Sequence, residues 1–162
     1  MTSIEKTEGV HDLKKIYEAG GYLNKDYMGQ ISYTVCLPIK YEKLAICLSF
    51  DKQKPTVISH ELMQDFLNRY ENGAGLPSLE ELDMKQTILD QKTEIHITAE
   101  LNEHFIGGIH KQLPKRYLLF SSDYASKGCI PQIHIQGMLK VTIIVFRILY
   151  DNTPYTLTVW GR

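Results

Sequence analysis

The chain has 162 residues, with a hydrophobic content of 43%, a charged content of 23% and a formal net charge of −1 at pH 7. These values are close to those of a typical globular protein, and the length is sufficient for one hydrophobic core. The balanced charge argues against an acidic tail or a polyanionic partner, so we expect no nucleic acid among the partners.

Residues 1–9 are polar and contain no apolar segment typical of a secretory signal. The longest apolar run, 142–146, is too short to cross a bilayer. We therefore expect a cytoplasmic protein with no membrane contact. The three cysteines follow neither C-x-x-C nor zinc-finger spacing, which favours free thiols. No glycine pattern fits a phosphate loop or a dinucleotide fingerprint, so we expect no cofactor. The cysteine spacing likewise leads us to expect no metal.

The first predicted element is a short helix over 7–19. Val10, Leu13, Ile16 and Tyr17 share one helical face, and Gly20 with Gly21 ends it. Strict alternation then predicts strands at 30–37 and 43–50, joined by 38–42 as a hairpin.

The middle segment, 59–91, is predicted to be helical. Ser59 is a suitable N-cap, and apolar residues follow at helical spacing as far as Tyr70. This helix is expected to end at Asn72, before a flexible stretch at 73–77. Ser78 begins a capping box that predicts a second helix.

The region 93–162 is predicted to be rich in strands, at 93–101, 116–121, 131–136, 138–150 and 155–160. The strand 138–150 would be about 43 Å long at about 3.3 Å per residue, so we expect a bend or a bulge within it. It carries apolar residues on both faces, which indicates a central position covered on both sides.

The predicted fold class is a single α+β domain over 1–162. We expect a mainly antiparallel, strongly curved sheet of about six or seven strands, with two or three helices packed on one side. Strand-rich ends around a helical middle segment argue against a parallel βαβ sheet.

The most informative feature is the chemistry of the less apolar strand faces. A sheet face open to water usually carries many Lys and Glu residues, whereas these faces are mostly small and weakly polar. They therefore predict a groove or a meeting surface with another element or subunit. The rows are Ser32, Thr34, Cys36; Ala45, Cys47, Ser49; Glu94, His96, Thr98, Glu100; and Gln132, His134, Gln136.

Acidic and histidine side chains in these rows are candidate catalytic residues: Glu94, His96, Glu100 and His134. Glu94 and His96 are two apart on one strand, so their side chains share a face. A carboxylate beside an imidazole can act as general acid and base. The alternative is a set of solvated cross-strand pairs, and His134 joins the site only if its strand lies near 93–101.

Cys36 and Cys47 form a candidate redox pair. Pairing the predicted hairpin so that Val35 faces Leu48 also places the two cysteines opposite each other, with Cβ atoms about 4.5–5.5 Å apart. A cross-strand disulfide or a soft-metal contact would then be within reach. The alternative is that both are small, reduced hydrophobic residues.

Three functional hypotheses follow from these patterns. The leading one is a non-catalytic binding or assembly module that self-associates to a homo-oligomer, with a small-molecule or protein ligand as a further partner. The second is a small hydrolase or isomerase that uses the Glu and His residues in a concave sheet. The third is a thiol- or metal-responsive protein acting through Cys36 and Cys47.

Overall fold

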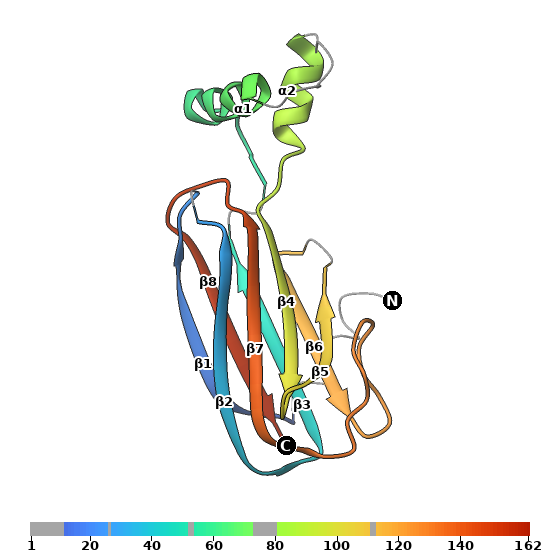
Figure 1. Ribbon diagram of the computed structural model, residues 1–162. Helices are drawn as coiled ribbons and strands as arrows, with labels where there is room; N and C mark the ends of the chain where they lie inside the picture. The colour runs from blue at the N-terminus through green and yellow to red at the C-terminus, as the bar shows by residue number, and fades with distance from the viewer. Residues whose placement is uncertain (1–11, 26, 52–53, 73–80, 111–112) are drawn as a thin grey trace.

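The computed structural model describes residues 12–25, 27–51, 54–72, 81–110 and 113–162, and it is a sandwich of two antiparallel four-stranded sheets (Figure 1). The first sheet has the strand order β1-β8-β3-β6 and the second sheet has the order β2-β7-β4-β5. The strands are β1 (Lys14–Leu23), β2 (Gly29–Tyr41), β3 (Lys43–Phe50), β4 (Glu94–Leu101), β5 (His104–Ile109), β6 (Lys115–Ser121), β7 (Ile135–Arg147) and β8 (Thr153–Gly161). The helices are α1 (His60–Asn72) and α2 (Glu81–Leu89).

The strand order is that of a jelly roll. β1 pairs with β8, β2 with β7, β3 with β6 and β4 with β5, so the chain behaves as one long hairpin wrapped around a core. Two further pairings, β3 with β8 and β4 with β7, complete the two sheets. A jelly roll of this kind has eight strands in two packed sheets.

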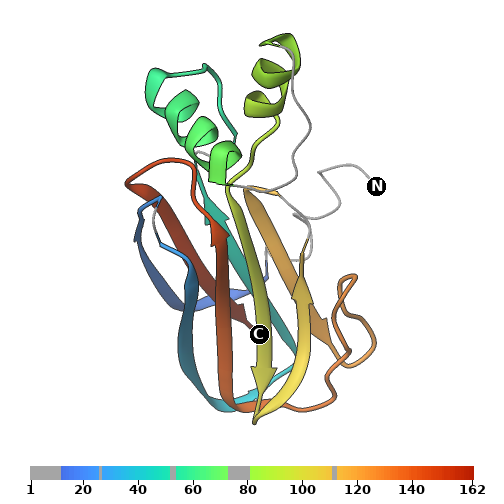
Figure 2. The ribbon, with the colours of Figure 1, turned by 45° about the horizontal axis from the view of Figure 1, so that its top comes forward.

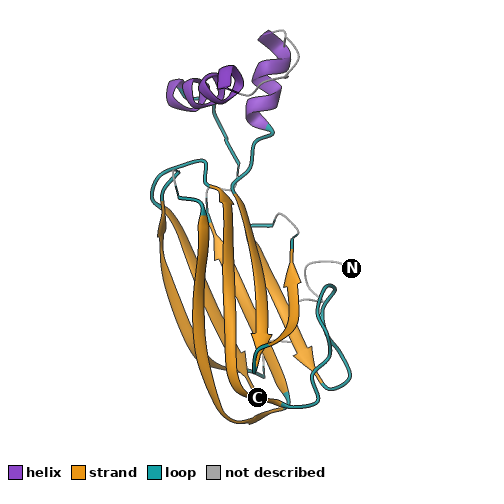
Figure 3. Ribbon diagram, in the orientation of Figure 1, coloured by secondary structure: helices purple, strands orange, loops and turns teal. Residues whose placement is uncertain are grey.

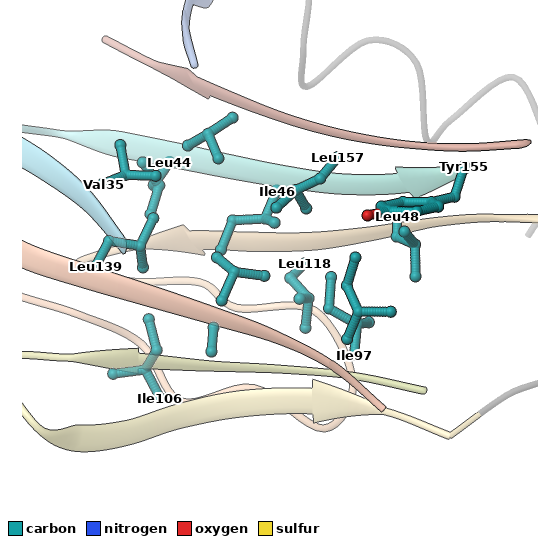
Figure 4. Packing of buried hydrophobic residues seen from close by; sticks show 14 of the residues in the cluster. Val35, Leu44, Ile46, Leu48, Ile97, Ile106, Leu118, Leu139, Tyr155 and Leu157 are labelled. Carbon is teal, nitrogen blue, oxygen red and sulfur yellow. The ribbon is translucent and has the colours of Figure 1, made fainter. Parts of the chain in front are cut away.

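The core lies between the two sheets and is formed by the apolar rows of the strands. Alternation brings every second side chain inward, and the inward rows of β2, β3 and β4 are the ones predicted from the sequence. Figure 4 shows side chains from both sheets packed against one another, including Val35, Leu44, Ile46, Ile97, Leu139 and Leu157. Burial of these rows is the main stabilising contribution to the fold.

The predicted single curved sheet with helices on one side is wrong in its layering. The main antiparallel character is confirmed, but the eight strands form two sheets that cover each other's apolar rows. Both helices lie between β3 and β4 in the chain and sit beyond one end of the sandwich, away from either sheet face (Figures 2 and 3). The second sheet therefore covers the apolar rows that we expected the helices to cover.

The predicted N-terminal helix is wrong over the residues that the structure describes, because β1 begins at Lys14; residues 7–11 lie outside them. A register shift between Lys15 and Tyr17 marks a β-bulge. Ile16 and Tyr17 consequently both pack against the core. Two neighbouring apolar residues on one side of a bulged strand imitate helical spacing.

The predicted hairpin of 30–37 with 43–50 is also wrong. β2 pairs with β7 in the second sheet, whereas β3 pairs with β6 and β8 in the first. The chain crosses between the sheets at Glu42, whose backbone N–H donates to the carbonyl of Arg162. Two consecutive strands with alternating patterns can pair as a hairpin or lie in two different sheets, because both arrangements bury the same apolar rows.

Several other predictions are confirmed. The predicted strands 131–136 and 138–150 are in fact one strand, β7, over Ile135–Arg147. It is central as predicted, and its register with β4 shifts at Phe146, which is the expected bulge. Ser59 caps α1, since its Oγ accepts a hydrogen bond of 3.1 Å from the backbone N–H of Leu62. The capping box at Ser78 lies outside the described residues. In the part of the chain that the structure describes, neither helix has the length and apolar character needed to cross a membrane.

Candidate functional site

The outer face of the second sheet contains most of the weakly polar rows that the sequence singled out. β2 and β4 turn Ser32, Thr34, Cys36, Glu94, His96, Thr98 and Glu100 away from the core, because the alternate residues are buried between the sheets. The row Ala45, Cys47 and Ser49 belongs to β3 and lies on the outer face of the first sheet. The predicted second face is therefore two faces on opposite sides of the molecule.

The middle of this outer face is neutral and small. Thr142 of β7 lies between Ser32 of β2 and Thr98 of β4 in one cross-strand row. The hydroxyl groups of Ser32 and Thr142 are 3.0 Å apart and share a hydrogen bond. In the next row, the Lys140 ammonium lies 3.4 Å from the Glu100 carboxylate. The charges of this region thus neutralise each other within the chain.

Apolar side chains stand on both sides of this neutral centre. Phe105 is 55% exposed, Met138 is 48% exposed and Phe146 is 47% exposed. Met138 and Phe146 both belong to the outward row of β7, which also contains the half-buried Ile144. The prediction that β7 is covered on both sides is therefore not met within the described residues of this chain.

A cluster of imidazole, carboxylate and aromatic groups surrounds His96 at the end of the face nearer the helices. His96 Nδ1 lies 3.0 Å from Nδ1 of His110, and His96 Nε2 lies 3.4 Å from Oε1 of Glu94. The ring of Phe146 packs against the His96 ring with centroids 4.6 Å apart. Burial and the neighbouring His110 lower the pKa of His96, while Glu94 acts in the opposite direction. His96 is therefore an imidazole held by neighbours on three sides.

The four predicted catalytic residues do not converge on one point. Glu94 and His96 are in contact, but Glu100 pairs with Lys140 about 13 Å further along β4, at about 3.3 Å per residue. His134 is exposed and directly precedes β7. Ile144 is the partner of His96, so His134 lies ten residues away along β7, or roughly 33 Å.

The predicted pairing of Cys36 with Cys47 is wrong. Cys36 is exposed on the outer face of the second sheet, opposite Met138. Cys47 is buried in the first sheet, between Tyr117 and Thr158. Because packed sheets are about 10 Å apart and these thiols point away from each other, no disulfide can join them.

Two members of the His96 cluster, His110 and Phe146, were missed from the sequence. No strand was predicted between 101 and 116, whereas Gly107 and Gly108 belong to β5. Glycine is needed there because a Cβ on Gly107 would lie 2.6 Å from Sγ of Cys129, in the loop that pairs with the edge of β5. Continuing the strand alternation through the two glycines would have brought His110 onto the face of His96.

Arg116 is a second feature that sequence reasoning missed. It is buried between the sheets, where its Nε donates a 2.8 Å hydrogen bond to the carbonyl of Leu113. Its guanidinium carbon lies 5.4 Å from the centre of the Phe50 ring. Nη1 and Nη2 have no hydrogen-bond partner among the described residues, and burial lowers the pKa of the group to about 10. A cation with this little compensation is costly to bury.

An open cleft of about 600 Å³ lies at the helical end of the sandwich. It is bounded by α1, by the β1–β2 connection and by the β7–β8 turn. Three of its charged groups are engaged with one another: the ammonium of Lys25 lies 3.1 Å from Glu61 and 3.4 Å from Asp65. Its lining also includes Lys54, Thr56 and Asp151.

Among the described residues, no group of three or more His, Cys, Asp or Glu side chains has an arrangement suited to holding a metal ion.

Comparison with known proteins gives one result. Residues 13–161 match the model of a family of unknown function, DUF6669. The chain belongs to this family. The match spans all eight strands and both helices. Searches of curated proteins and of solved structures found no match.

Proposed function

We propose that the chain is a non-catalytic binding or assembly module that associates with a second copy of itself through the outer face of the second sheet. The observation that carries this proposal is the outward row of β7, a central strand that exposes Met138 and Phe146 on either side of a neutral centre. Exposed apolar groups gathered on one face favour a protein contact over contact with water.

The charge of this face favours a second copy as the occupant. Lys140 is paired with Glu100, so the centre of the face carries no net charge and two copies of it meet without strong like-charge repulsion there. A basic or acidic partner would find no complementary charge here. A two-fold arrangement would also bring the same patch to both sides of the interface, as in most homodimers.

The dimensions of the face fit a small specific interface. Four strands spaced about 4.8 Å apart and nine residues of β7 at about 3.3 Å each span about 19 Å by about 30 Å. The side chains project from the sheet, so the accessible area is larger than this flat estimate and approaches the roughly 800 Å² per partner of a standard interface.

The three free cysteines are compatible with the reducing cytoplasm that we propose as the compartment.

The fold does not by itself choose among functions, since jelly rolls include capsid, lectin and enzyme domains. The alternative of a small hydrolase or isomerase is less favoured by the geometry. It requires Glu94, His96, Glu100 and His134 around one substrate, and His134 lies roughly 33 Å along β7 from the row of His96. A thiol-responsive function through Cys36 and Cys47 would require each cysteine to act alone.

The experiment is a concentration series by light scattering and native mass spectrometry on the wild type, Met138→Lys and Thr156→Lys. Met138 lies in the proposed interface, whereas Thr156 is an exposed residue on the outer face of the first sheet. We expect a dimer in the wild type and in Thr156→Lys, and a dissociation constant at least about tenfold higher in Met138→Lys. A monomeric wild type throughout the series, or equal weakening by both substitutions, would overturn the proposal.

A further inference from the structure

The two histidines of the outer face are directly opposed across neighbouring strands. Ile97 pairs with Ile109, so the next cross-strand pair outward joins His96 to His110. Their Nδ1 atoms are 3.0 Å apart, and their rings are almost perpendicular at 82° with centroids 4.8 Å apart. One imidazole therefore donates its Nδ1–H to the lone pair on Nδ1 of the other.

Glu94 determines which nitrogen of His96 carries the proton. Its Oε1 lies 3.4 Å from His96 Nε2, so a proton on Nε2 faces a carboxylate oxygen. In that tautomer the lone pair of His96 Nδ1 is directed at His110. A carboxylate that holds the remote N–H of an imidazole is the arrangement found behind metal-bound histidines, where it orients the ring and raises its basicity.

The separation of the two Nδ1 atoms matches that of neighbouring ligands on a small divalent ion. With metal–nitrogen bonds of about 2.0–2.1 Å, adjacent ligands lie about 2.9 Å apart at a right angle and about 3.3 Å apart at the tetrahedral angle. The observed 3.0 Å falls within this range. A metal ion could therefore replace the shared proton at nearly the same nitrogen–nitrogen distance, with the rings turned so that both lone pairs point to the ion.

The ring of Phe146 restrains His96 from the other side. Its centroid lies 4.6 Å from that of His96, and only 12% of the His96 side chain is exposed. His110 is exposed, so the remaining coordination positions face solvent. The result is one restrained ligand, one accessible ligand and an open side.

We propose that His96 and His110 bind a transition-metal ion of the Zn²⁺, Ni²⁺ and Cu²⁺ class through their Nδ1 atoms, with Glu94 as a positioning residue. Imidazole nitrogen suits these ions, whereas Mg²⁺ and Ca²⁺ require oxygen ligands. Two protein ligands leave the other positions to water or to an incoming group, so the site is an open one with moderate affinity. Both ligands come from one chain, so the site is complete without a second copy.

The test is a zinc titration of the full chain by calorimetry, with His96→Ala, His110→Ala, Glu94→Gln and the control His134→Ala. We expect one zinc per chain in the wild type and in His134→Ala, and loss of this binding in both proposed-ligand variants. Glu94→Gln should weaken binding about 10-fold to 100-fold, as changes behind a metal ligand do. Equal zinc affinity in the wild type and His96→Ala would overturn the proposal.

Nitrogen NMR of the wild-type chain gives a readout that depends on no variant. We expect zinc to shift the Nδ1 signals of His96 and His110 while the Nε2 proton of His96 is retained. Shifts confined to His104 or His134 would contradict the site. The titration is repeated on Met138→Lys, which lies at the far end of the face: retained zinc binding in a monomeric Met138→Lys variant separates this site from the proposed self-association.

Discussion

The hydroxyl groups of Tyr33 and Tyr155 lie 2.6 Å apart and form a hydrogen bond that joins the two sheets of the sandwich. Tyr33 belongs to β2 of the second sheet, and Tyr155 belongs to β8 of the first. Tyr155 is buried, whereas Tyr33 is half-buried. The bond is therefore a polar link at the edge of a mainly apolar interior.

Removing one hydroxyl from this pair should cost more than removing both. Tyr33→Phe leaves the buried Tyr155 hydroxyl without this partner, and we expect a loss of about 1–3 kcal/mol in the free energy of unfolding. The double variant Tyr33→Phe with Tyr155→Phe should lie closer to the wild type. Urea denaturation of the single and double variants measures the coupling, and additive losses would contradict the link between the sheets.

A stabilising substitution is expected in the β4–β5 turn. Asn102 and Glu103 have φ values of 50° and 67°, which is the left-handed conformation of a two-residue hairpin turn. Glycine adopts this conformation without strain, so Glu103→Gly should raise the free energy of unfolding by up to about 1 kcal/mol. Glu103→Ala is the control and should give no such gain. Thermal and urea unfolding of both variants are the measurements.

The buried guanidinium of Arg116 should be replaceable by an apolar side chain. Because Nη1 and Nη2 have no hydrogen-bond partner among the described residues, Arg116→Met removes an uncompensated charge while keeping a long side chain near Phe50. We expect unchanged or higher stability, by up to about 1–4 kcal/mol. Arg116→Ala should be less stable than Arg116→Met because it also removes packing. A large loss in Arg116→Met would indicate that the guanidinium holds an anion in solution.

The stability of the chain should fall on the alkaline side. Burial raises the pKa of the Cys47 thiol and of the Tyr155 hydroxyl, and the hydrogen bond with Tyr33 acts in the same direction on Tyr155. The unfolded chain therefore releases these protons first. The stabilisation is fully present below the unfolded values of about 8.5 for Cys and about 10 for Tyr, and it decreases as pH rises above them.

Urea unfolding between neutral pH and about pH 11 measures this decrease. Because burial raises the pKa of the Cys129 thiol as well, the double variant Cys47→Ala with Cys129→Ala should delay its onset toward the range in which tyrosine ionises. An unfolding free energy that stays constant above about pH 9 would show that neither group has a raised pKa.

The three thiols should differ in their reaction with an alkylating reagent. Cys36 is exposed, whereas Cys47 is buried and Cys129 is half-buried, and burial raises the pKa of both of the latter. The thiolate is the reactive form, so we expect rapid modification of Cys36 and slow modification of the other two in the native chain. Mass spectrometry of time points, with a urea-unfolded control in which all three react, tests this order.

The candidate site could be predicted only in part. Strand alternation correctly put Glu94 and His96 on one face, because side chains two apart on a strand point the same way. It could not bring in Phe146, which faces His96 through the bulge of β7, or His110, which lies beyond two glycines. It also could not show that His134 lies at the far end of β7, since that position depends on strand pairing.

The sequence by itself determined which rows of β2, β3 and β4 face the core, and it placed the helical segment between 59 and 91. The inward rows of β2, β3 and β4, the Ser59 cap and the central position of β7 all follow from local chemistry. Only the tertiary structure decided which strands pair and how many sheets they form. The physical reason is that backbone hydrogen bonds between strands are the same for every sequence, so an alternating strand specifies its buried side but not its neighbour. The separation of Cys36 from Cys47 and the approach of His96 to His110 both depend on that choice of neighbour.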